Sequence, residues 1–258
     1  MTYRLFLPDG NGVIESVVAD DRPHRAAVAR AIERRQSAAL VRVDHGIQAL
    51  FFDMDATVIA QESIDELAKV AGVGAQVELI TTAAMNGRID FPMALRERVA
   101  LLKGLSLAAV ADVGRSLTIN LGMTEFLATA RRHGVKCYIV SGGFTTLVAP
   151  VAATLGFDDM CANTLGVANG TLTGTVDGAI VDGAMKREYV ARTMTTLGAS
   201  PQQAAVVGDG ANDRPMMQSA GVAFGFHPKA ILTPDLDGAT FSDHRLLARF
   251  LWPGDKGL

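Results

Sequence analysis

Two aspartates, one residue apart, follow an apolar run early in the chain. The segment Phe51 to Thr57 reads Phe-Phe-Asp-Met-Asp-Ala-Thr, which places Asp53 and Asp55 where a short buried strand would end. Parallel α/β sheets bind their ligands in the crevice at the carboxyl ends of the strands. A carboxylate at that position can act as a nucleophile or as a ligand of a hard cation. Most isolated pairs of this kind are solvated turn residues, so chemistry requires further groups.

Three later segments supply groups that suit a phosphate and a cation. Ser141-Gly142-Gly143 ends a second apolar run, where glycines and a hydroxyl favour an anion; a capped tight turn is the alternative. Lys186 opposes the dipole of an expected helix unless an anion lies beside it; a surface lysine paired with Glu188 is the alternative. The stretch Gly208 to Asp213 reads Gly-Asp-Gly-Ala-Asn-Asp, and its oxygen ligands suit magnesium. This last pattern favours function over a polar turn by itself.

The elements that would position these groups alternate between strands and helices. Four short apolar runs predict strands that are buried on both faces: Gln48 to Phe52, Val135 to Ser141, Ala204 to Gly208 and Val222 to Phe226. Helical stretches such as Thr124 to His133 lie between them. The alternation predicts an α/β fold with a doubly wound, parallel, Rossmann-like sheet.

Two segments interrupt this alternation. Residues 62–120 show helix signals without a strand: Ser63-x-x-Glu66 fits a capping box, and Asp90 can cap a helix that carries Arg98. We expect these residues to form a helical cap, inserted after the first core strand and lying over its mouth. Residues 164–176 alternate polar and apolar side chains around Asn169-Gly170, which predicts a β-hairpin flap. The catalytic core would then comprise residues 46–61 and 121–258.

Residues 1–45 predict a small α+β appendage. Tyr3 to Leu7, Val13 to Val18 and Ala38 to Val43 suggest strands, and Pro23 to Gln36 suggests a helix. The segment offers no recognisable chemistry. We expect it to serve in packing or in forming a homodimer rather than in sensing a ligand.

The composition narrows the classes of partner. The chain has 258 residues, a net charge of -3 and 6% aromatic residues, without a long Lys/Arg run, so no nucleic-acid partner is expected. Pro8 and Asp9 interrupt the first apolar residues, which argues against a secretory signal, and no stretch reaches the length of a membrane span. Cys137 and Cys161 give no disulfide framework, and we expect both in the core of a cytoplasmic protein.

The motifs together resemble the haloacid dehalogenase superfamily of aspartyl-phosphate phosphotransferases. Asp53-x-Asp55-x-Thr57, Ser141, Lys186 and Gly208 to Asp213 match its four motifs in order and spacing, over residues 47 to about 230. Further segments are similar to the phosphoserine phosphatase family: Asp53 to Glu62, Ile80 to Gly87, Asp90-Phe91, Leu95 to Val99, Leu101 to Gly104, Ser141 to Phe144 and Gly170 to Gly174.

The resemblance implies a two-step phosphoryl transfer. Asp53 would be the nucleophile, and Asp55 the general acid and then the general base. Mg²⁺ would be held by Asp53, the backbone carbonyl of Asp55 and Asp209. Asp213 would orient the metal shell and Lys186.

The resemblance also implies phosphoserine as the small-molecule substrate, and the last step of serine biosynthesis as the reaction. Its three charged groups call for an anion, a forked cation and a phosphate cradle. Glu62 would meet the ammonium group and Arg98 the carboxylate, while Met85 and Phe91 would shield the site. The residues expected around the phosphate are Ser141, Gly142, Lys186 and Asn212.

Two other functions remain open. The same chemistry could act on another small phosphomonoester or transfer phosphate between alcohols, or the chain could bind a phospholigand without turning it over. Two departures from the family pattern also stand out. Ala56 replaces a usual serine, for which we expect a modest loss of hydrogen bonding, and residues 1–45 do not match a full amino-acid-binding regulatory domain.

Overall fold

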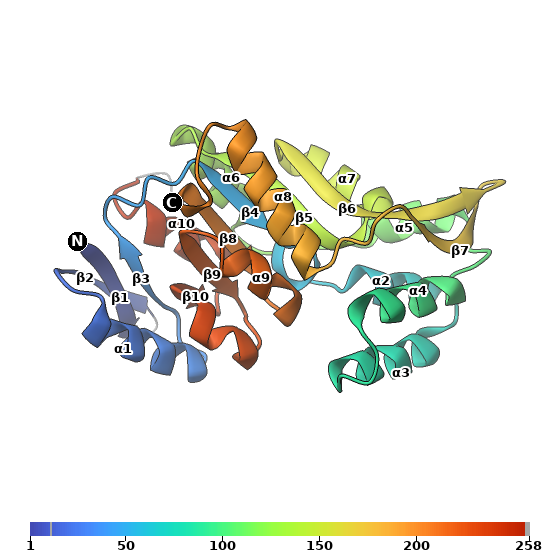
Figure 1. Cartoon of the computed structure of the whole chain (residues 1–258), viewed down its shortest axis with the longest axis horizontal. Helices are drawn as coiled ribbons and strands as arrows, with labels where there is room; N and C mark the ends of the chain where they lie inside the picture. Colours follow the sequence, from blue (N-terminus) through green and yellow to red (C-terminus); the bar gives the residue numbers. More distant parts are fainter. Residues whose placement is uncertain (11, 256–258) are drawn as a thin grey trace.

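A mixed sheet runs through the computed structural model, which describes residues 1–10 and 12–255, without the side chain of Met85 (Figure 1). Within these residues the sheet has ten strands, in the order β2-β1-β3-β10-β9-β8-β4-β5-β6-β7. The strands are β1 (Tyr3–Asp9), β2 (Gly12–Val18), β3 (Ala38–Arg42), β4 (Ala49–Phe52), β5 (Lys136–Phe144), β6 (Asp159–Ala168), β7 (Thr171–Asp177), β8 (Ala204–Gly208), β9 (Val222–Phe226) and β10 (Gly238–Thr240).

The centre of this sheet is parallel, as predicted. Strands β10, β9, β8, β4, β5 and β6 pair in parallel, in that order. Strand β4 lies between β8 and β5, and all four of its residues are buried. A strand covered on both faces needs apolar side chains at every position, which explains its unbroken apolar sequence.

Helices cover both faces of the sheet, so the fold is doubly wound. One face carries α1 (Arg22–Glu33), α8 (Gly183–Thr196) and α9 (Arg214–Met217), and the other carries α6 (Met123–Arg132), α7 (Thr145–Leu155) and α10 (His244–Leu251). Phe51 belongs to the core cluster that includes Met194 of α8, whereas Phe52 belongs to the cluster that includes Phe126 of α6 and Leu247 of α10. Successive side chains of β4 thus anchor the two layers.

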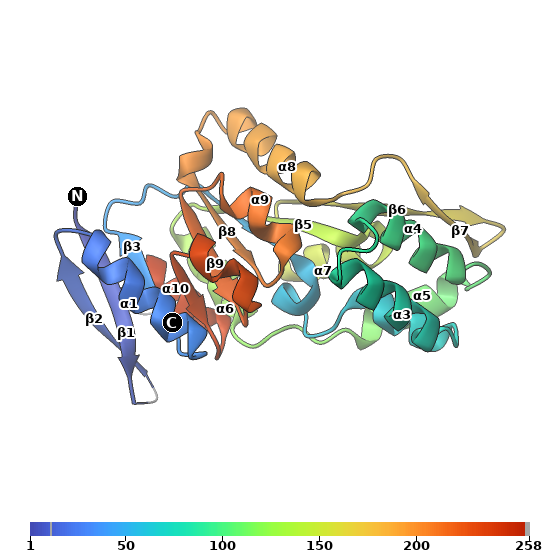
Figure 2. The same cartoon turned by 60° about the horizontal axis from the view of Figure 1, so that its bottom comes forward.

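Four helices fill the segment expected to form the cap: α2 (Ser63–Val70), α3 (Gly74–Met85), α4 (Phe91–Leu101) and α5 (Leu107–Ser116). In both views they lie at the end of the molecule opposite the N-terminal strands (Figures 1 and 2). Asp90 caps α4 by accepting a hydrogen bond from the Met93 amide at 2.8 Å. The predicted capping box at Ser63 is wrong. Ser63 is already helical, and its hydroxyl donates to the half-buried carboxylate of Asp55 instead.

The predicted hairpin is formed by β6 and β7. Asn169 and Gly170 both have positive φ, 50° and 74°, as a two-residue hairpin turn requires. The outer edge of β7 then bonds to the loop before α5: Gly104 N donates to Leu172 O, and Leu172 N donates to Leu105 O. The hairpin therefore ties the cap helices to the core sheet.

The N-terminal strands and helix form close to their predicted positions. β3 pairs antiparallel with β10, so these residues extend the core sheet rather than lie apart from it; the domain boundary at residue 45 remains a prediction. Cys137 is buried as expected, but Cys161 is only half-buried, because β6 is incompletely covered there. Among the described residues, no helix is both long and apolar enough to cross a membrane.

Candidate active site

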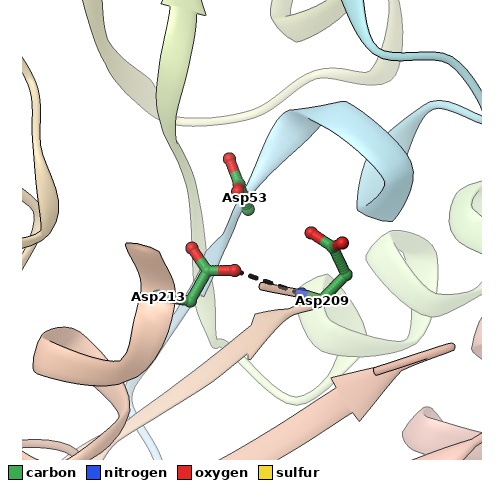
Figure 3. A group of neighbouring side chains, drawn as sticks. All are labelled: Asp53, Asp209 and Asp213. Carbon is green, nitrogen blue, oxygen red and sulfur yellow. Dashed lines mark hydrogen bonds between the residues drawn. The ribbon is translucent and has the colours of Figure 1, made fainter. Parts of the chain in front are cut away.

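The carboxylates of three motif residues converge at the carboxyl ends of β4 and β8. Asp53 follows β4, and Asp209 and Asp213 follow β8 (Figure 3). Each contributes one carboxylate oxygen, and these three oxygens lie within 4.8 Å of one another. All three residues are buried. The Asp53 amide donates to Val207 O at 2.9 Å, which fixes Asp53 against the neighbouring strand.

Lys186 lies inside this cluster. Its ammonium group is 2.9 Å from Asp53 Oδ2 and 2.8 Å from Asp213 Oδ1, and its side chain is fully buried. Burial alone would lower the pKa of Lys186, but attraction to Asp213 and Asp53 raises it above its ordinary value. The alternative of a surface lysine is therefore wrong.

Both carboxylate oxygens of Asp213 accept hydrogen bonds from the protein. Oδ1 accepts from Lys186, and Oδ2 accepts from the amides of Asp209 and Gly210 at 3.1 and 3.2 Å. A Cβ on Gly208 would come within 2.2 Å of Asp213 Oδ2, so this contact requires glycine. Burial, followed by repulsion from Asp53, raises the pKa of Asp213. Because both oxygens are committed, Asp213 suits an orienting role better than direct ligation.

Asp55 has different surroundings, two residues beyond Asp53. Its Oδ2 accepts from the hydroxyl and the amide of Ser63 at 2.7 and 3.0 Å, while Oδ1 is buried without a partner among the described residues. Burial raises the pKa of Asp55 to about 8, even though the Ser63 hydrogen bonds lower it. A protonated carboxyl with a free oxygen is the state that a general acid needs.

The predicted phosphate cradle lies next to Asp55. Ser141 Oγ accepts from the Gly143 amide at 2.9 Å, and a Cβ on Gly143 would lie 3.6 Å from Asp55 Oδ2. A Cβ on Gly142 would lie 3.1 Å from the Phe91 ring, so the cap closes directly over this backbone. Asn212 Nδ2 donates to Asp53 Oδ2 at 3.2 Å.

Two predicted cap residues interact electrostatically with the aspartates of the site. Arg98 donates only to Ala94 O and to Thr81 Oγ1, and it has no ion pair within the described part of the chain. Burial lowers the pKa of Arg98, while attraction to Asp65, Glu62 and Asp55 raises it. Glu62 is exposed to solvent on one side. Desolvation by the surrounding protein, followed by repulsion from Asp209, still raises the pKa of its carboxyl group. The side chain of Met85 lies outside the described residues.

Three residues next to the site were not predicted from the sequence. Lys229, in the loop after β9, places its ammonium group 3.0 Å from Asp209 Oδ2. Asn120 Nδ2 and His244 Nε2 lie 2.7 and 2.8 Å from the carbonyl oxygen of Thr57, in the turn Met54–Val58 that carries Asp55. Lys229 follows a strand that ends at the same edge as Asp209, which could have indicated it. Asn120 and His244 come from distant segments and gave no local signal.

Comparison with known proteins identifies the family. A family model for haloacid dehalogenase-like hydrolases matches residues 50–218. The chain belongs to this family. It is 44% identical to the phosphoserine phosphatase of Albidiferax ferrireducens over 185 residues, which cover 69% of the chain and 78% of that relative. This match places the haloacid dehalogenase-like hydrolase among the phosphoserine phosphatases.

Two further matches agree with this placement. The phosphoserine phosphatase of Archaeoglobus fulgidus is 40% identical over 190 residues, which cover 74% of this chain but only 55% of that relative. A solved phosphoserine phosphatase structure, described as a phospho-aspartyl intermediate analogue, superposes with a TM-score of 0.75 at 34% identity. That superposition covers 80% of this chain and 99% of the other, so the hydrolase shares both the family sequence and the family fold.

Proposed function

We propose that the enzyme hydrolyses O-phospho-L-serine to L-serine and phosphate through a phosphorylated Asp53. The observation that carries this proposal is the placement of Glu62 and Arg98. Among the described residues, neither the Glu62 carboxylate nor the Arg98 guanidinium group has an ion-pair partner, and each interacts electrostatically with aspartates of the site. They match the ammonium and carboxylate of a phospho-amino acid. The relatives named phosphoserine phosphatase support the same substrate.

In the first step, Asp53 attacks phosphorus and the bond to the serine oxygen breaks. Asp55 gives its proton to that departing oxygen, a role that fits its raised pKa and its unpartnered Oδ1. Lys186, the Ser141 hydroxyl and the backbone at Gly142 would hold the phosphoryl oxygens. These charges and dipoles are in place before the reaction, so little reorganisation is needed.

In the second step, water attacks the phosphorus of the aspartyl-phosphate. Asp55, now deprotonated, accepts a proton from that water, and the bond between phosphorus and Asp53 breaks. Phosphate leaves, and both aspartates return to their starting forms. Asn212, which donates to Asp53 Oδ2, would steady the nucleophile through the cycle.

The donor set suits a divalent cation. Asp53 and Asp209 are buried carboxylates with oxygens within 4.8 Å, the hard ligands that Mg²⁺ prefers. We propose that these two side chains and the carbonyl of Asp55 hold Mg²⁺, with Asp213 as the orienting carboxylate. When bound, the ion would neutralise negative charge that develops on the phosphoryl group.

The substrate assignment is tested with a panel of phosphomonoesters. We expect O-phospho-L-serine to be hydrolysed faster than O-phosphoethanolamine, which lacks the carboxylate, and glycerol 2-phosphate, which lacks both charged groups. Arg98→Ala should lower kcat/KM on phosphoserine by about tenfold or more and leave the rate on phosphoethanolamine nearly unchanged. Equal losses on both substrates would exclude the carboxylate clamp. Phosphoserine binding without turnover would favour the non-enzymatic alternative.

We also infer that two copies pair through the outer edge of the N-terminal unit. Along β2 no side chain is fully buried, and Ile14 and Val17 are 54% and 63% exposed. The opposite sheet edge, β7, is covered by the cap loop. An uncovered edge strand favours pairing with another strand, and lysines on the strand oppose it. Light scattering should give a dimer mass for the wild type and a monomer mass for Ile14→Lys/Val17→Lys; a monomeric wild type would disprove the pairing.

We place the reaction in the cytoplasm. Cys137 and Cys161 are both free thiols, which suits a reducing compartment. Fractionation of the source cells, with detection of the native protein, tests this placement.

A further inference from the structure

Lys229 is a charged residue at the site that the proposed mechanism does not use. The three clustered carboxylates are met by two lysines: Lys186 pairs with Asp53 and Asp213, and Lys229 pairs with Asp209. Every carboxylate of the cluster therefore already has a cation from the protein. The two lysines differ in their surroundings, and that difference suggests different roles.

Lys186 is locked in place, whereas Lys229 is not. The Lys186 side chain is fully buried and contacts two carboxylates. The Lys229 side chain is 55% exposed and makes a single ion pair, with Asp209 Oδ2. An ion pair with a half-exposed lysine is weak, so the ammonium group can move away at little cost. Only the backbone of Lys229 is fixed, by a hydrogen bond from its amide to Asp209 O at 2.8 Å.

The contact also involves the carboxylate that a metal would need. Asp209 is nearly buried and would have to present a carboxylate oxygen to the ion. Lys229 Nζ lies 3.0 Å from Oδ2 and would lie 3.5 Å from a Cβ on Gly210, so it reaches into the site from the solvent side. An ammonium group at that place repels a divalent cation bound to the same carboxylate.

We propose that Lys229 is an exchangeable counter-ion of Asp209, which competes with the divalent cation and weakens its binding to the site. The inference rests on the metal site of the proposed function. With metal absent, the ammonium group compensates the charge of Asp209. With metal bound, it moves out toward solvent. Lys229 is thus a positioning residue that sets metal affinity, and it takes no part in the bonds that change.

The opposite role would give the opposite result. If Lys229 held Asp209 in the orientation that the metal requires, removing its charge would weaken binding. Metal affinity therefore separates competition from support, and activity need not be measured.

The test is calorimetric titration of metal-free protein with Mg²⁺ alone. We expect Lys229→Met to bind Mg²⁺ about two- to fivefold more tightly than the wild type, the range expected from loss of one exposed ion pair. Lys229→Arg keeps the charge and should stay within about twofold of the wild type. Lys136→Met is the matched control: Lys136 is 56% exposed and pairs with Asp158 at 2.7 Å, away from the site. It should leave Mg²⁺ affinity unchanged.

Thermal melting gives a second readout. Lys229→Met should lower the Tm of the metal-free protein, and saturating Mg²⁺ should raise its Tm by more than it raises that of the wild type. Unchanged or weaker Mg²⁺ binding by Lys229→Met would overturn the proposal. No Mg²⁺ binding by the wild type would instead overturn the metal site itself, and this inference with it.

Discussion

The two motif aspartates show how surroundings give one residue type two roles. Asp53 faces the ammonium group of Lys186 and the amide of Asn212, which suits a charged nucleophile. Asp55 is half-buried, its Oδ1 is enclosed by protein, and its hydrogen bonds come from Ser63. The chain separates the two carboxyls by a single residue, yet the fold gives one a cation and raises the pKa of the other.

The hydroxyl of Ser63 should lower the pKa of Asp55. It donates to Asp55 Oδ2 and so favours the carboxylate form, which lowers a pKa that burial raises to about 8. The proposed first step needs protonated Asp55, so kcat/KM should fall as the pH rises through about 8. Ser63→Ala removes the hydrogen bond and should move this fall to higher pH. A pH profile of kcat/KM checks the shift, and a fall at lower pH than in the wild type would contradict it.

At the scale of elements, helix α10 fastens the turn that carries Asp55. His244, its first residue, is buried with Nε2 2.8 Å from Thr57 O and its ring stacked on Phe226 at 4.0 Å. The turn also holds Ala56 at a φ of 52°, a conformation that only tight local packing maintains. Helix α10 therefore supports the turn that carries Asp55.

This contact predicts a pH dependence of stability. Burial lowers the pKa of His244 to about 4, whereas an unfolded histidine titrates near its ordinary value of 6.5. Between these values the unfolded chain binds a proton that the folded protein does not bind. The free energy of unfolding therefore falls as the pH drops from 6.5 to 4, by up to about 3 kcal/mol from this residue.

The measurement compares His244→Gln with the wild type by denaturant unfolding from pH 7 to pH 4. The variant should lose less stability over this range, because its side chain does not titrate. His24→Gln, on α1 and outside the site, is the control and should follow the wild type. Parallel curves for all three proteins would show that His244 is not buried in its neutral form.

The hairpin and helix α4 meet at Gly174. This residue has a φ of 85°, and a Cβ there would lie 3.0 Å from Lys103 Cβ and 3.2 Å from Ala100 O. Gly174→Ala should cost about 1–3 kcal/mol in stability and raise KM, because it adds crowding between hairpin and cap to backbone strain. Gly170→Ala is the control, since Gly170 also has positive φ but open space around it. Melting and steady-state kinetics test both, and equal effects would mean that the contact is unimportant.

At the scale of the whole molecule, the sequence predicted those strands and site residues that follow from local sequence patterns. Strands β8 and β9 have the predicted bounds because their side chains are buried on both faces and so form unbroken apolar runs. The motif residues lie together because each lies in the last residues of a strand, in the loop after a strand or in the first turn of a helix, at one edge of the sheet. These features follow from periodicity and from the rule that parallel strands end together.

Features that depend on tertiary contact were not predictable in this way. Strand β10 has only three residues, too few for any periodicity, and it becomes a strand by pairing with β9 and β3. Ser63 fits a helix cap locally, but its hydroxyl donates to the carboxylate of Asp55, which lies outside the helix. Lys229 and Asp209 are 20 positions apart, and their pairing depends on how two loops meet.

The central claim is that Asp53 is the nucleophile for phosphoserine hydrolysis, and phosphate release from O-phospho-L-serine by Asp53→Asn tests it most directly. Asp158→Asn serves as the control, because Asp158 pairs with Lys136 outside the site. With Mg²⁺ present, we expect Asp53→Asn to lose about three orders of magnitude or more in kcat, because no other group can form the covalent intermediate. Asp158→Asn should retain the wild-type rate. Phosphate release by Asp53→Asn at a rate near that of the wild type would contradict the account.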